Sequence, residues 1–410
     1  MSAKIISTKE ELDGFICHNW NEINKYIESL KVNLPIPFYS SVDIRESKTK
    51  YAPVDHNMYP AGFNNVCAID LRESVPVIKN TILKMNPNAN VVGIIPESHT
   101  KNLFYLDHLH TLSSLVKGAG YVVKLFTFDP NVFEDGQNTV QLTSHSGHAV
   151  QIEKAEIKNQ EIYVGGIKVD AIIMNNDQSN PLPVTWNEIT TPISPSPEIG
   201  WFRRQKNIHF SYYQKVVSQF AEHFNIDCNL LHAKFRAVDQ VDFETKEGLE
   251  PLAETVDELI NELGPGAKVF VKASQGTYGM GISVVSSGEE IRNMNRKTRN
   301  KMDVGKNAIK FTSVLVQEGV ETIIKYDDSP AEITIYLVDG LCIGGFMRAN
   351  AEKDSLGNLN SKGMVFRKLC MSNISQDDDH KCKEAIYSIV ARLSTIAAAH
   401  EIKEVLSVKK

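Results

Sequence analysis

The sequence predicts a mixed α/β (α+β) fold, in which an N-terminal region with a parallel sheet precedes a region of short strands and glycine loops. Residues 91–129 show the pattern strand, helix, strand, and a helical crossover of this kind joins parallel strands. From residue 265 the pattern changes to strands separated by glycines. We therefore expect an α/β region at 1–200, a helical connection at 201–264 and a second region at 265–410.

Length and composition are those of an ordinary globular protein. The chain has 410 residues, 42% of them hydrophobic and 23% charged, which excludes a disordered, collagenous or coiled-coil protein. With 50 acidic and 44 basic residues the net charge is −6, so no overall positive field attracts nucleic acid or an anionic membrane. Neither is expected as a partner, and the sequence leaves a homo-oligomer open.

The cysteines and the apolar segments indicate where the protein works. Six cysteines lie far apart and form no C-x-x-C pair, unlike a disulfide framework. The N-terminus carries charges where a signal peptide needs an apolar stretch. No apolar run approaches the ~20 residues that cross a bilayer. We expect a soluble, cytoplasmic protein with reduced cysteines.

The first elements have clear local signals. Thr8 and Glu11 form a capping box that begins a helix, and a proline-containing segment from residue 35 follows it. Strands are predicted at 91–95 and 121–126, and leucines at helical spacing lie between them.

The remaining elements follow from alternation and helical periodicity. Residues 149–170 alternate around a polar turn and predict an antiparallel hairpin, followed by a buried strand at 171–174. Helices are predicted at 205–224 and 252–263. The chain closes with a helix at 381–400, whose apolar residues form one stripe.

The segment with the clearest chemistry is a strand at 269–273 followed by a glycine-rich loop. Lys272 lies near the end of this buried strand, where an ammonium group is costly unless it meets an anion. Glycines let backbone N–H groups approach phosphate oxygens closely. We predict that a nucleotide is bound by Lys272 and by the loop residues Gly276, Thr277, Tyr278 and Gly279. The alternative is an ordinary glycine hairpin with a solvated lysine.

The order of lysine and glycines distinguishes this segment from other phosphate-binding motifs. A P-loop places its lysine after the glycines, and so does a protein kinase. Here Lys272 precedes Gly276, which is the arrangement of ATP-grasp ligases. A strand at 313–318 ends in Gln317 and Glu318 and resembles the ATP-grasp hinge strand, whose backbone pairs with adenine and whose acidic residue holds the ribose. It could equally lead into an acidic turn.

A predicted hairpin carries a further charged pair. An alternating stretch turns at Asp339-Gly340, and this dipeptide is a strong hairpin signal. The pairing brings Glu332 and Arg348 to the same end of the ribbon. A cation there can stabilise charge on a transferring phosphoryl group, so we predict Arg348, together with Lys272, as catalytic. A purely structural Glu–Arg pair is the alternative.

Polar residues crowd a segment near the N-terminus that is bounded by Pro53 and Gly62. So many polar groups on a constrained, non-periodic loop indicate a small-molecule site. The loop residues predicted to bind substrate are Asp55, His56, Asn57, Asn64 and Asn65. A loop that only hydrogen-bonds to itself is the alternative.

A basic run, Arg203, Arg204 and Lys206, precedes and opens the predicted helix at 205–224. Basic residues oppose the dipole at a helix N-terminus, which favours a bound anion there. We predict that Arg203 binds substrate, with a carboxylate or the nucleotide phosphates as the anion. A solvated basic face is the alternative.

Together these motifs resemble a known family, the proteobacterial glutamate–cysteine ligases of the Thiobacillus ferrooxidans type, an ATP-grasp-like group. The segments that carry the resemblance cover most of the chain: 50–65, 96–102, 175–177, 200–206, 209–210, Arg348 and 358–360. The resemblance implies ATP-dependent joining of the γ-carboxylate of L-glutamate to the amine of L-cysteine, the first step towards glutathione. ATP first phosphorylates the carboxylate, and the amine then displaces phosphate. The implied cofactors are ATP and Mg²⁺, and catalysis rests on positioning and charge neutralisation.

One departure from the family pattern concerns the metal. Many ATP-grasp enzymes hold Mg²⁺ with an Asp and a Glu-x-Asn near the C-terminus, but no such set follows the helix at 381–400. We therefore predict earlier ligands: Glu332, Asn358 and Asn360. The two asparagines lie on one side of an extended segment, as ligands would. An asparagine-rich turn is the alternative for this pair.

Two other functions remain open at this point. One is another ATP-grasp carboxylate–amine or peptide ligase with a different acceptor. The other is a non-catalytic nucleotide-binding regulator. The presence of Lys272, Arg348, Asn358 and Asn360 favours an enzyme, because a simple binder does not need all of them. The expected partners are small molecules: glutamate, cysteine and ATP.

Overall fold

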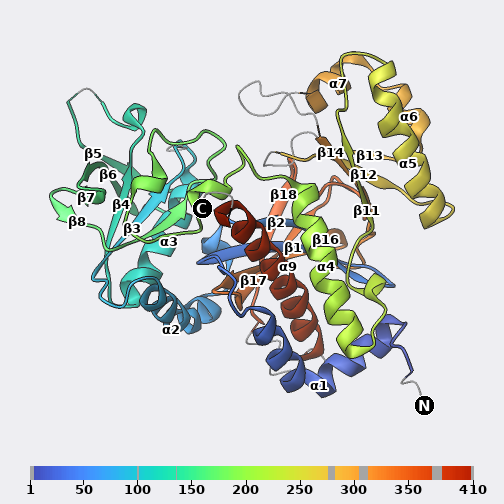
Figure 1. Ribbon diagram of the computed structural model, residues 1–410, viewed down its shortest axis with the longest axis horizontal. Helices are drawn as coiled ribbons and strands as arrows, with labels where there is room; N and C mark the ends of the chain where they lie inside the picture. The colour runs from blue at the N-terminus through green and yellow to red at the C-terminus, as the bar shows by residue number, and fades with distance from the viewer. Residues whose placement is uncertain are drawn as a thin grey trace.

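The computed structural model describes residues 4–98, 101–134, 136–275, 282–303, 313–371 and 381–407. Within these residues the strands form three sheets, and helices cover them (Figure 1). The helices are α1 (Lys9–Leu30), α2 (Ala68–Met85), α3 (Leu103–Gly118), α4 (Lys206–Phe224), α5 (Glu250–Leu263), α6 (Gly288–Arg292), α7 (Arg296–Asp303) and α9 (Lys381–Ser407). Short 3₁₀ helices are η1 (Phe63–Asn65), η2 (Pro130–Val132), η3 (Trp186–Glu188), η4 (Pro197–Ile199), η5 (Cys228–Leu230) and η6 (Glu247–Leu249). The predicted mixed α/β class is confirmed.

A central antiparallel sheet contains strands from both the N-terminal and the C-terminal part of the chain (Figure 1). It lies between the other two sheets. Its strands, in spatial order, are β18 (Met364–Leu369), β17 (Leu341–Asn350), β16 (Ser329–Val338), β1 (Tyr39–Glu46) and β2 (Tyr51–Asn57), with β15 (Lys325–Tyr326) beside β16. The predicted hairpin is confirmed: Asp339 and Gly340 have φ of 52° and 68°, the positive values of a type I′ turn. The boundary near residue 200 stays a prediction, and β1 and β2 pair with each other beside β16 of the C-terminal region.

Three helices, α1, α4 and α9, pack on one face of this central sheet (Figure 1). The predicted apolar stripe of α9 meets buried residues such as Val42 and Ile44 of β1. Each fully buried aliphatic side chain of this kind stabilises the fold by about 1.5–3 kcal/mol. The capping box of α1 is confirmed, because the Thr8 hydroxyl accepts a hydrogen bond from the backbone N–H of Glu11. No helix in the described part of the chain has the length and apolar character to span a membrane.

The second sheet contains the predicted strand–helix–strand unit. Its spatial order is β10 (Ile193–Ser194), β9 (Ala171–Asn175), β3 (Val91–Pro96), β4 (Val122–Thr127), β6 (Ala149–Lys158), β7 (Glu161–Val164) and β8 (Ile167–Lys168), with β5 (Thr139–Thr143) beside β6. The strands from β10 to β6 are parallel, and the predicted hairpin of β6 and β7 is antiparallel. Helices α2 and α3 pack together beside it and share its core.

The third sheet is antiparallel and carries the predicted nucleotide-binding strands. Its order is β11 (Phe235–Asp239), β14 (Ser313–Glu318), β12 (Val269–Ala273) and β13 (Ile282–Val285). Buried residues of α5 pack on one face of this sheet, against β12 and β14. The opposite face is turned towards the central sheet (Figure 1). Two predicted strands that lie far apart in the sequence, β12 and β14, are therefore direct neighbours.

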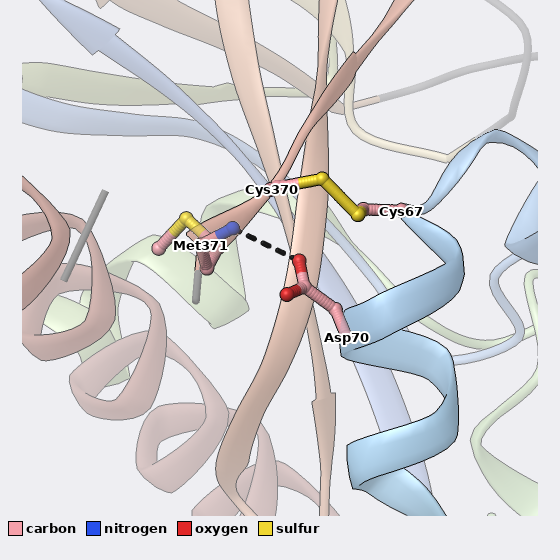
Figure 2. The surroundings of a disulfide bond; sticks show 4 residues. All are labelled: Cys67, Asp70, Cys370 and Met371. Atoms are coloured by element: carbon pink, nitrogen blue, oxygen red, sulfur yellow. Dashed lines mark hydrogen bonds between the residues drawn. A yellow bond between two sulfur atoms is a disulfide. The ribbon is translucent and has the colours of Figure 1, made fainter. Parts of the chain in front are cut away.

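A disulfide bond links the start of α2 to the segment after β18 (Figure 2). Cys67 and Cys370 are 303 residues apart in the sequence, and their Cα atoms lie 5.2 Å apart. Next to the bond, Asp70 accepts a hydrogen bond of 2.9 Å from the backbone N–H of Met371. The prediction that the cysteines are reduced is therefore wrong for this pair. The wide spacing of these two cysteines in the sequence does not indicate that the fold brings their thiols into contact.

Loss of this disulfide is expected to destabilise the fold. A cross-link restricts the unfolded chain, and removing a native one typically costs about 2–4 kcal/mol. Cys67→Ser should lower the denaturant concentration at the unfolding midpoint in non-reducing buffer, whereas Cys228→Ser, at a free thiol, should not. Equal midpoints for the two variants, or a non-reducing peptide digest without the Cys67–Cys370 cross-link, would contradict the pairing.

Candidate active site

The strand β1 divides its side chains between the two faces of the central sheet. Val42 and Ile44 point into the core under α9, so Asp43 and Arg45 point to the opposite face. There, charged residues of five strands and of α4 gather. We call the following set the Lys272 cluster: Asp43, Arg45, Asp55, Lys206, Lys272, Glu332 and Arg348.

Within the cluster, two guanidinium groups and two carboxylates form a network of ion pairs. Arg348 Nη1 donates to Asp43 at 2.9 Å and to Glu332 at 2.7 Å, and Arg45 Nε donates to the other oxygen of Glu332 at 3.0 Å. All four side chains are buried. Glu332 and Arg348 are direct partners in the pairing of β16 with β17, so the predicted proximity of these residues is confirmed.

Lys272 approaches this network of ion pairs from the third sheet. Its ammonium donates to the backbone oxygen of Val54 at 2.8 Å and to Oε1 of Gln317 at 2.7 Å. The register explains why the Val54 carbonyl is available. Asp43 pairs with Asp55 but Ile44 pairs with Pro53, so Val54 is the extra residue of a β-bulge.

Asp55 and Lys206 form the partly open side of the cluster. Lys206 Nζ lies 2.5 Å from Asp55 Oδ1, and the side chain of Asp55 is 28% exposed. The backbone N–H of Lys206, at the start of α4, donates to the oxygen of Ser274 at 2.7 Å. The start of α4 is thereby fixed to the chain just before the predicted glycine loop.

The close packing of charges shifts several pKa values. Burial lowers the pKa of Lys272 from 10.5 to about 7, although Asp55 opposes this shift. Burial acts to raise the pKa of Asp55, but Lys206 and Lys272 outweigh it and hold the value at about 2. Burial raises the pKa of Asp43 despite the neighbouring Arg348. Asp55 is therefore ionised at neutral pH, whereas Lys272 can change its charge there.

Two buried donors of the site have no hydrogen-bond partner among the described residues: Arg348 Nε and Gln317 Nε2. A buried donor left unpaired costs about 1–3 kcal/mol. When Lys272 is protonated, the cluster also contains four cationic side chains against three carboxylates. Unpaired donors together with an excess of positive charge favour an anionic ligand, such as a phosphate or a carboxylate.

The predicted nucleotide-binding residues fall into two groups. Gly276, Thr277, Tyr278 and Gly279 lie outside the described residues. Gln317 and Glu318 end the strand β14, as predicted. Gln317 meets Lys272, but Glu318 is bound by Lys50 at 2.8 Å and by the backbone N–H of Lys234 at 2.8 Å.

The predicted substrate loop is in part a strand. Asp55, His56 and Asn57 belong to β2, so the loop assignment is wrong for them. Pro53 suggested a loop, but β2 is an edge strand, where proline is tolerated. Only Asp55 joins the cluster, because His56 points to the α9 face and bonds to Ser394. Asn64 and Asn65 lie in η1, and no described contact links them to Lys272.

The basic run before α4 is divided as well. Arg203 is 46% exposed, and its nearest described carboxylate is Glu198 at 3.9 Å. Its predicted role in substrate binding stays a prediction. Arg204 and Lys206 point inwards instead, and each lies over the ring of Trp201, at 5.1 and 4.8 Å.

The predicted magnesium ligands do not fit a metal as the structure arranges them. Oxygen donors such as Glu332, Asn358 and Asn360 are the type that Mg²⁺ prefers. However, both oxygens of Glu332 are held by guanidinium groups, and Asn358 Oδ1 accepts from the backbone of Asn360 at 3.1 Å. In the described part of the chain, no group of three or more His, Cys, Asp or Glu residues could hold a metal ion.

Two residues of the cluster, Asp43 and Arg45, were not predicted as site residues. A signal for them exists in the sequence, because they alternate with the apolar residues Val42 and Ile44. Two opposite charges on one face of a buried strand need partners there. The strand at residues 39–46 was itself not predicted, so this signal was not used.

Comparisons with known proteins show which family the chain resembles. The model of the family described as glutamate-cysteine ligase matches residues 13–402. A crystal structure from Methylobacillus flagellatus KT, of a protein provisionally assigned as a gamma-glutamylcysteine synthetase, is 32% identical and has a TM-score of 0.88; the match covers 98% of each chain. No curated protein matches the chain.

Two further solved structures are more distant. D-alanyl-alanine synthetase A from Vibrio cholerae is 11% identical, with a TM-score of 0.35 over 64% of this chain and 66% of that one. A glutathione synthetase-like effector from Globodera pallida is also 11% identical, with a TM-score of 0.42 over 86% and 82%. Scores this low do not establish a shared fold. The family match spans most of the sequence, however, and the chain therefore belongs to the glutamate–cysteine ligase family.

Proposed function

We propose that the Lys272 cluster is where this ligase joins glutamate to cysteine at the expense of ATP, through a γ-glutamyl phosphate. The observation that carries the proposal is the buried Lys272 cluster and, at it, two donors that have no hydrogen-bond partner among the described residues, Arg348 Nε and Gln317 Nε2. Such donors suit the oxygens of a transferring phosphoryl group, because they are already oriented and need no reorganisation during the reaction.

In the first half-reaction an oxygen of the glutamate γ-carboxylate attacks the γ-phosphorus of ATP, and ADP leaves. Lys272, from β12, neutralises charge on the phosphates, and Arg348 donates to the oxygens of the group in transfer. Asp55 is ionised and partly exposed, so it binds the α-ammonium of glutamate. These contacts hold the carboxylate in line with the phosphorus.

In the second half-reaction the unprotonated amine of cysteine attacks the acyl carbon. The bond from that carbon to the phosphate oxygen breaks, inorganic phosphate leaves with the bonding electrons, and the nitrogen gives up one proton to the departing phosphate. Phosphorylation is needed because an unmodified carboxylate oxygen is a poor leaving group. Arg348 stabilises the charge on the departing phosphate, as it did on the arriving phosphoryl group. Magnesium is the metal that the family implies, but no step here is assigned to it.

Release of ADP from wild-type protein tests this function against its alternatives. With Mg-ATP, glutamate and cysteine together, ADP should appear at a rate that needs all three. ADP release with glutamate and another amine, but not with cysteine, would instead favour a peptide ligase with a different acceptor. Binding of ATP without any ADP release would favour a non-catalytic nucleotide-binding regulator.

Proton uptake should accompany ATP binding above neutral pH. Lys272 is mostly neutral at pH 8.5 because its pKa is about 7, but phosphate favours the ammonium form. Calorimetric titrations in two buffers of different ionisation enthalpy should therefore show uptake that approaches one proton at pH 8.5 and nearly vanishes at pH 5.5. Lys272→Met should abolish it. Identical enthalpies in both buffers at pH 8.5 would contradict this role of Lys272.

The same shift makes the stability of the unliganded protein depend on pH. The folded pKa of Lys272 lies below its ordinary value of 10.5, so between about pH 7 and that value the unfolded chain binds more protons. The contribution of this group to folding stability therefore rises with pH across this interval and is lost as pH falls through it.

A further inference from the structure

A second buried network lies directly behind the Lys272 cluster, on the α9 face of β2. It consists of polar side chains from β2, from α4 and the turn before it, and from α9: His56, Arg204, His209, Ser394 and Glu401. All five are less than 10% exposed. The site described above uses none of them except through the backbone of β2.

Glu401 is the centre of this network. Its two oxygens accept hydrogen bonds from Nε and Nη2 of Arg204 at 3.1 and 3.2 Å, a bidentate pair. One of them also lies 2.5 Å from Nδ1 of His209. Burial acts to raise the pKa of Glu401, but Arg204 and His209 outweigh it and lower the value. The carboxylate is therefore ionised and holds the guanidinium in one orientation.

Arg204 transmits this orientation to the substrate side of β2. Its remaining nitrogen, Nη1, donates to the backbone oxygen of His56 at 2.6 Å. On the other side of Asp55, Lys272 donates to the backbone oxygen of Val54 at 2.8 Å. Asp55 thus lies between two backbone carbonyls, each held by a cation from a different element.

The contacts of Lys272 and Arg204 with the backbone on either side of Asp55 matter because β2 is held only weakly by its own sheet. It is an edge strand with β1 as its only described neighbour in the ladder, and the bulge at Val54 interrupts the pairing next to Asp55. Hydrogen bonds of the sheet therefore do not by themselves fix the direction of the Asp55 side chain. The contacts of Lys272 and Arg204 with the backbone, together with the ion pair between Lys206 and Asp55, supply the missing constraint.

We infer that Glu401 is a positioning residue for glutamate binding: through Arg204 it fixes the segment 54–56 so that Asp55 faces the substrate ammonium. The inference rests on the proposed function, since it takes Asp55 as the glutamate contact. It assigns a role in the reaction to the last turns of α9, which belong to neither the nucleotide strands nor the charged face of the central sheet.

The test is the substitution Glu401→Gln, which keeps the shape of the side chain and removes its charge. Without a carboxylate, Arg204 loses its bidentate partner, and the orientation in which it donates to His56 is no longer fixed. We expect KM for glutamate to rise about 10-fold, which is less than the ~100-fold loss of activity that a misplacement of 1 Å can cause. KM for ATP should stay near the wild-type value, because Lys272 keeps its bond to Gln317.

A second variant, Arg204→Lys, should act in the same direction, because one ammonium group cannot reproduce both the fork to Glu401 and the bond to His56. It keeps the test valid if Glu401→Gln does not fold. The matched control is Glu46→Gln. Glu46 is equally buried and bonds to Lys9 of α1 and Tyr387 of α9, but it lies on the α9 face of β1, away from Asp55. Its KM for glutamate should not change.

The outcomes separate a positioning role from a merely structural one. A lowered unfolding midpoint with wild-type KM values in both variants would overturn the inference, and so would an equal rise of KM in Glu46→Gln. Calorimetric titration of glutamate tests the same step without turnover. If wild-type protein binds glutamate but releases no ADP, the proposed function fails, whereas weaker glutamate binding by Glu401→Gln would still support the positioning role. If wild-type protein binds no glutamate, both are overturned.

Discussion

Replacing Arg348 with lysine is expected to lower kcat by about 100- to 1,000-fold, the loss that follows removal of a donor to a developing anion. The folded structure should survive, because both ion pairs of Arg348, to Asp43 and Glu332, use the single nitrogen Nη1. A lysine ammonium can replace that nitrogen. It cannot replace Nε, the buried donor without a described partner. Steady-state ADP release and the unfolding midpoint, measured on the same preparation, check both parts.

Arg292→Lys is the matched control for this substitution. Arg292, on α6, also pairs with carboxylates, most closely those of Glu250 and Asp257, but it lies at the surface beside α5. Its replacement should leave kcat unchanged. Wild-type turnover in Arg348→Lys would exclude Arg348 as the residue that stabilises the phosphoryl group. A large fall in the unfolding midpoint would show that its role is to hold the sheet together.

The second large effect is expected for Lys272→Met, which should weaken ATP binding. A hydrogen bond to a charged group contributes about 1.5–3 kcal/mol, which corresponds to roughly 10- to 150-fold in affinity. Methionine fills a similar volume, so the core of the third sheet around β12 should remain packed. Calorimetric titration with ATP at pH 6.0, where the lysine of the wild type is mostly charged, measures the change directly.

Lys124→Met is the control for this variant, because Lys124 also lies on a strand and is paired with one carboxylate, Glu153, at 2.8 Å in the parallel sheet. Its ATP affinity should equal that of the wild type. Unchanged ATP affinity in Lys272→Met would assign the nucleotide to another part of the molecule and remove the basis of the proposed mechanism.

Local patterns were enough to predict most of the elements. The capping box at Thr8, the strand–helix–strand unit at 91–129 and the Asp339-Gly340 hairpin are all confirmed, because each depends on residues close together in the chain. The Glu332–Arg348 pair was predicted for the same reason: the turn fixes the register of the hairpin. Lys272 and Gln317 were identified separately, and their contact depends on β12 pairing with β14.

What local patterns did not predict depends on long-range pairing. Asp43 and Asp55 join the site because β1 and β2 pair beside β16, which lies almost 300 positions later in the chain. Nothing in the sequence of β1 or β2 indicates that β16 is their neighbour in the sheet. Pro53 made β2 look like a loop, although an edge strand accommodates it. Cys67 and Cys370 show the same limit, and so does Glu401, whose partners Arg204 and His209 come from another region.

The central claim is that glutamate is activated as a γ-glutamyl phosphate, and transfer of oxygen tests it most directly. Glutamate labelled with ¹⁸O in its γ-carboxylate is incubated with wild-type protein, Mg-ATP and cysteine. Mass spectrometry then follows the dipeptide and the phosphate. We predict γ-glutamylcysteine, ADP and one labelled oxygen in each phosphate released, because the oxygen that attacks ATP leaves with the phosphate. Dipeptide formed with unlabelled phosphate, or no dipeptide at all, would contradict the account.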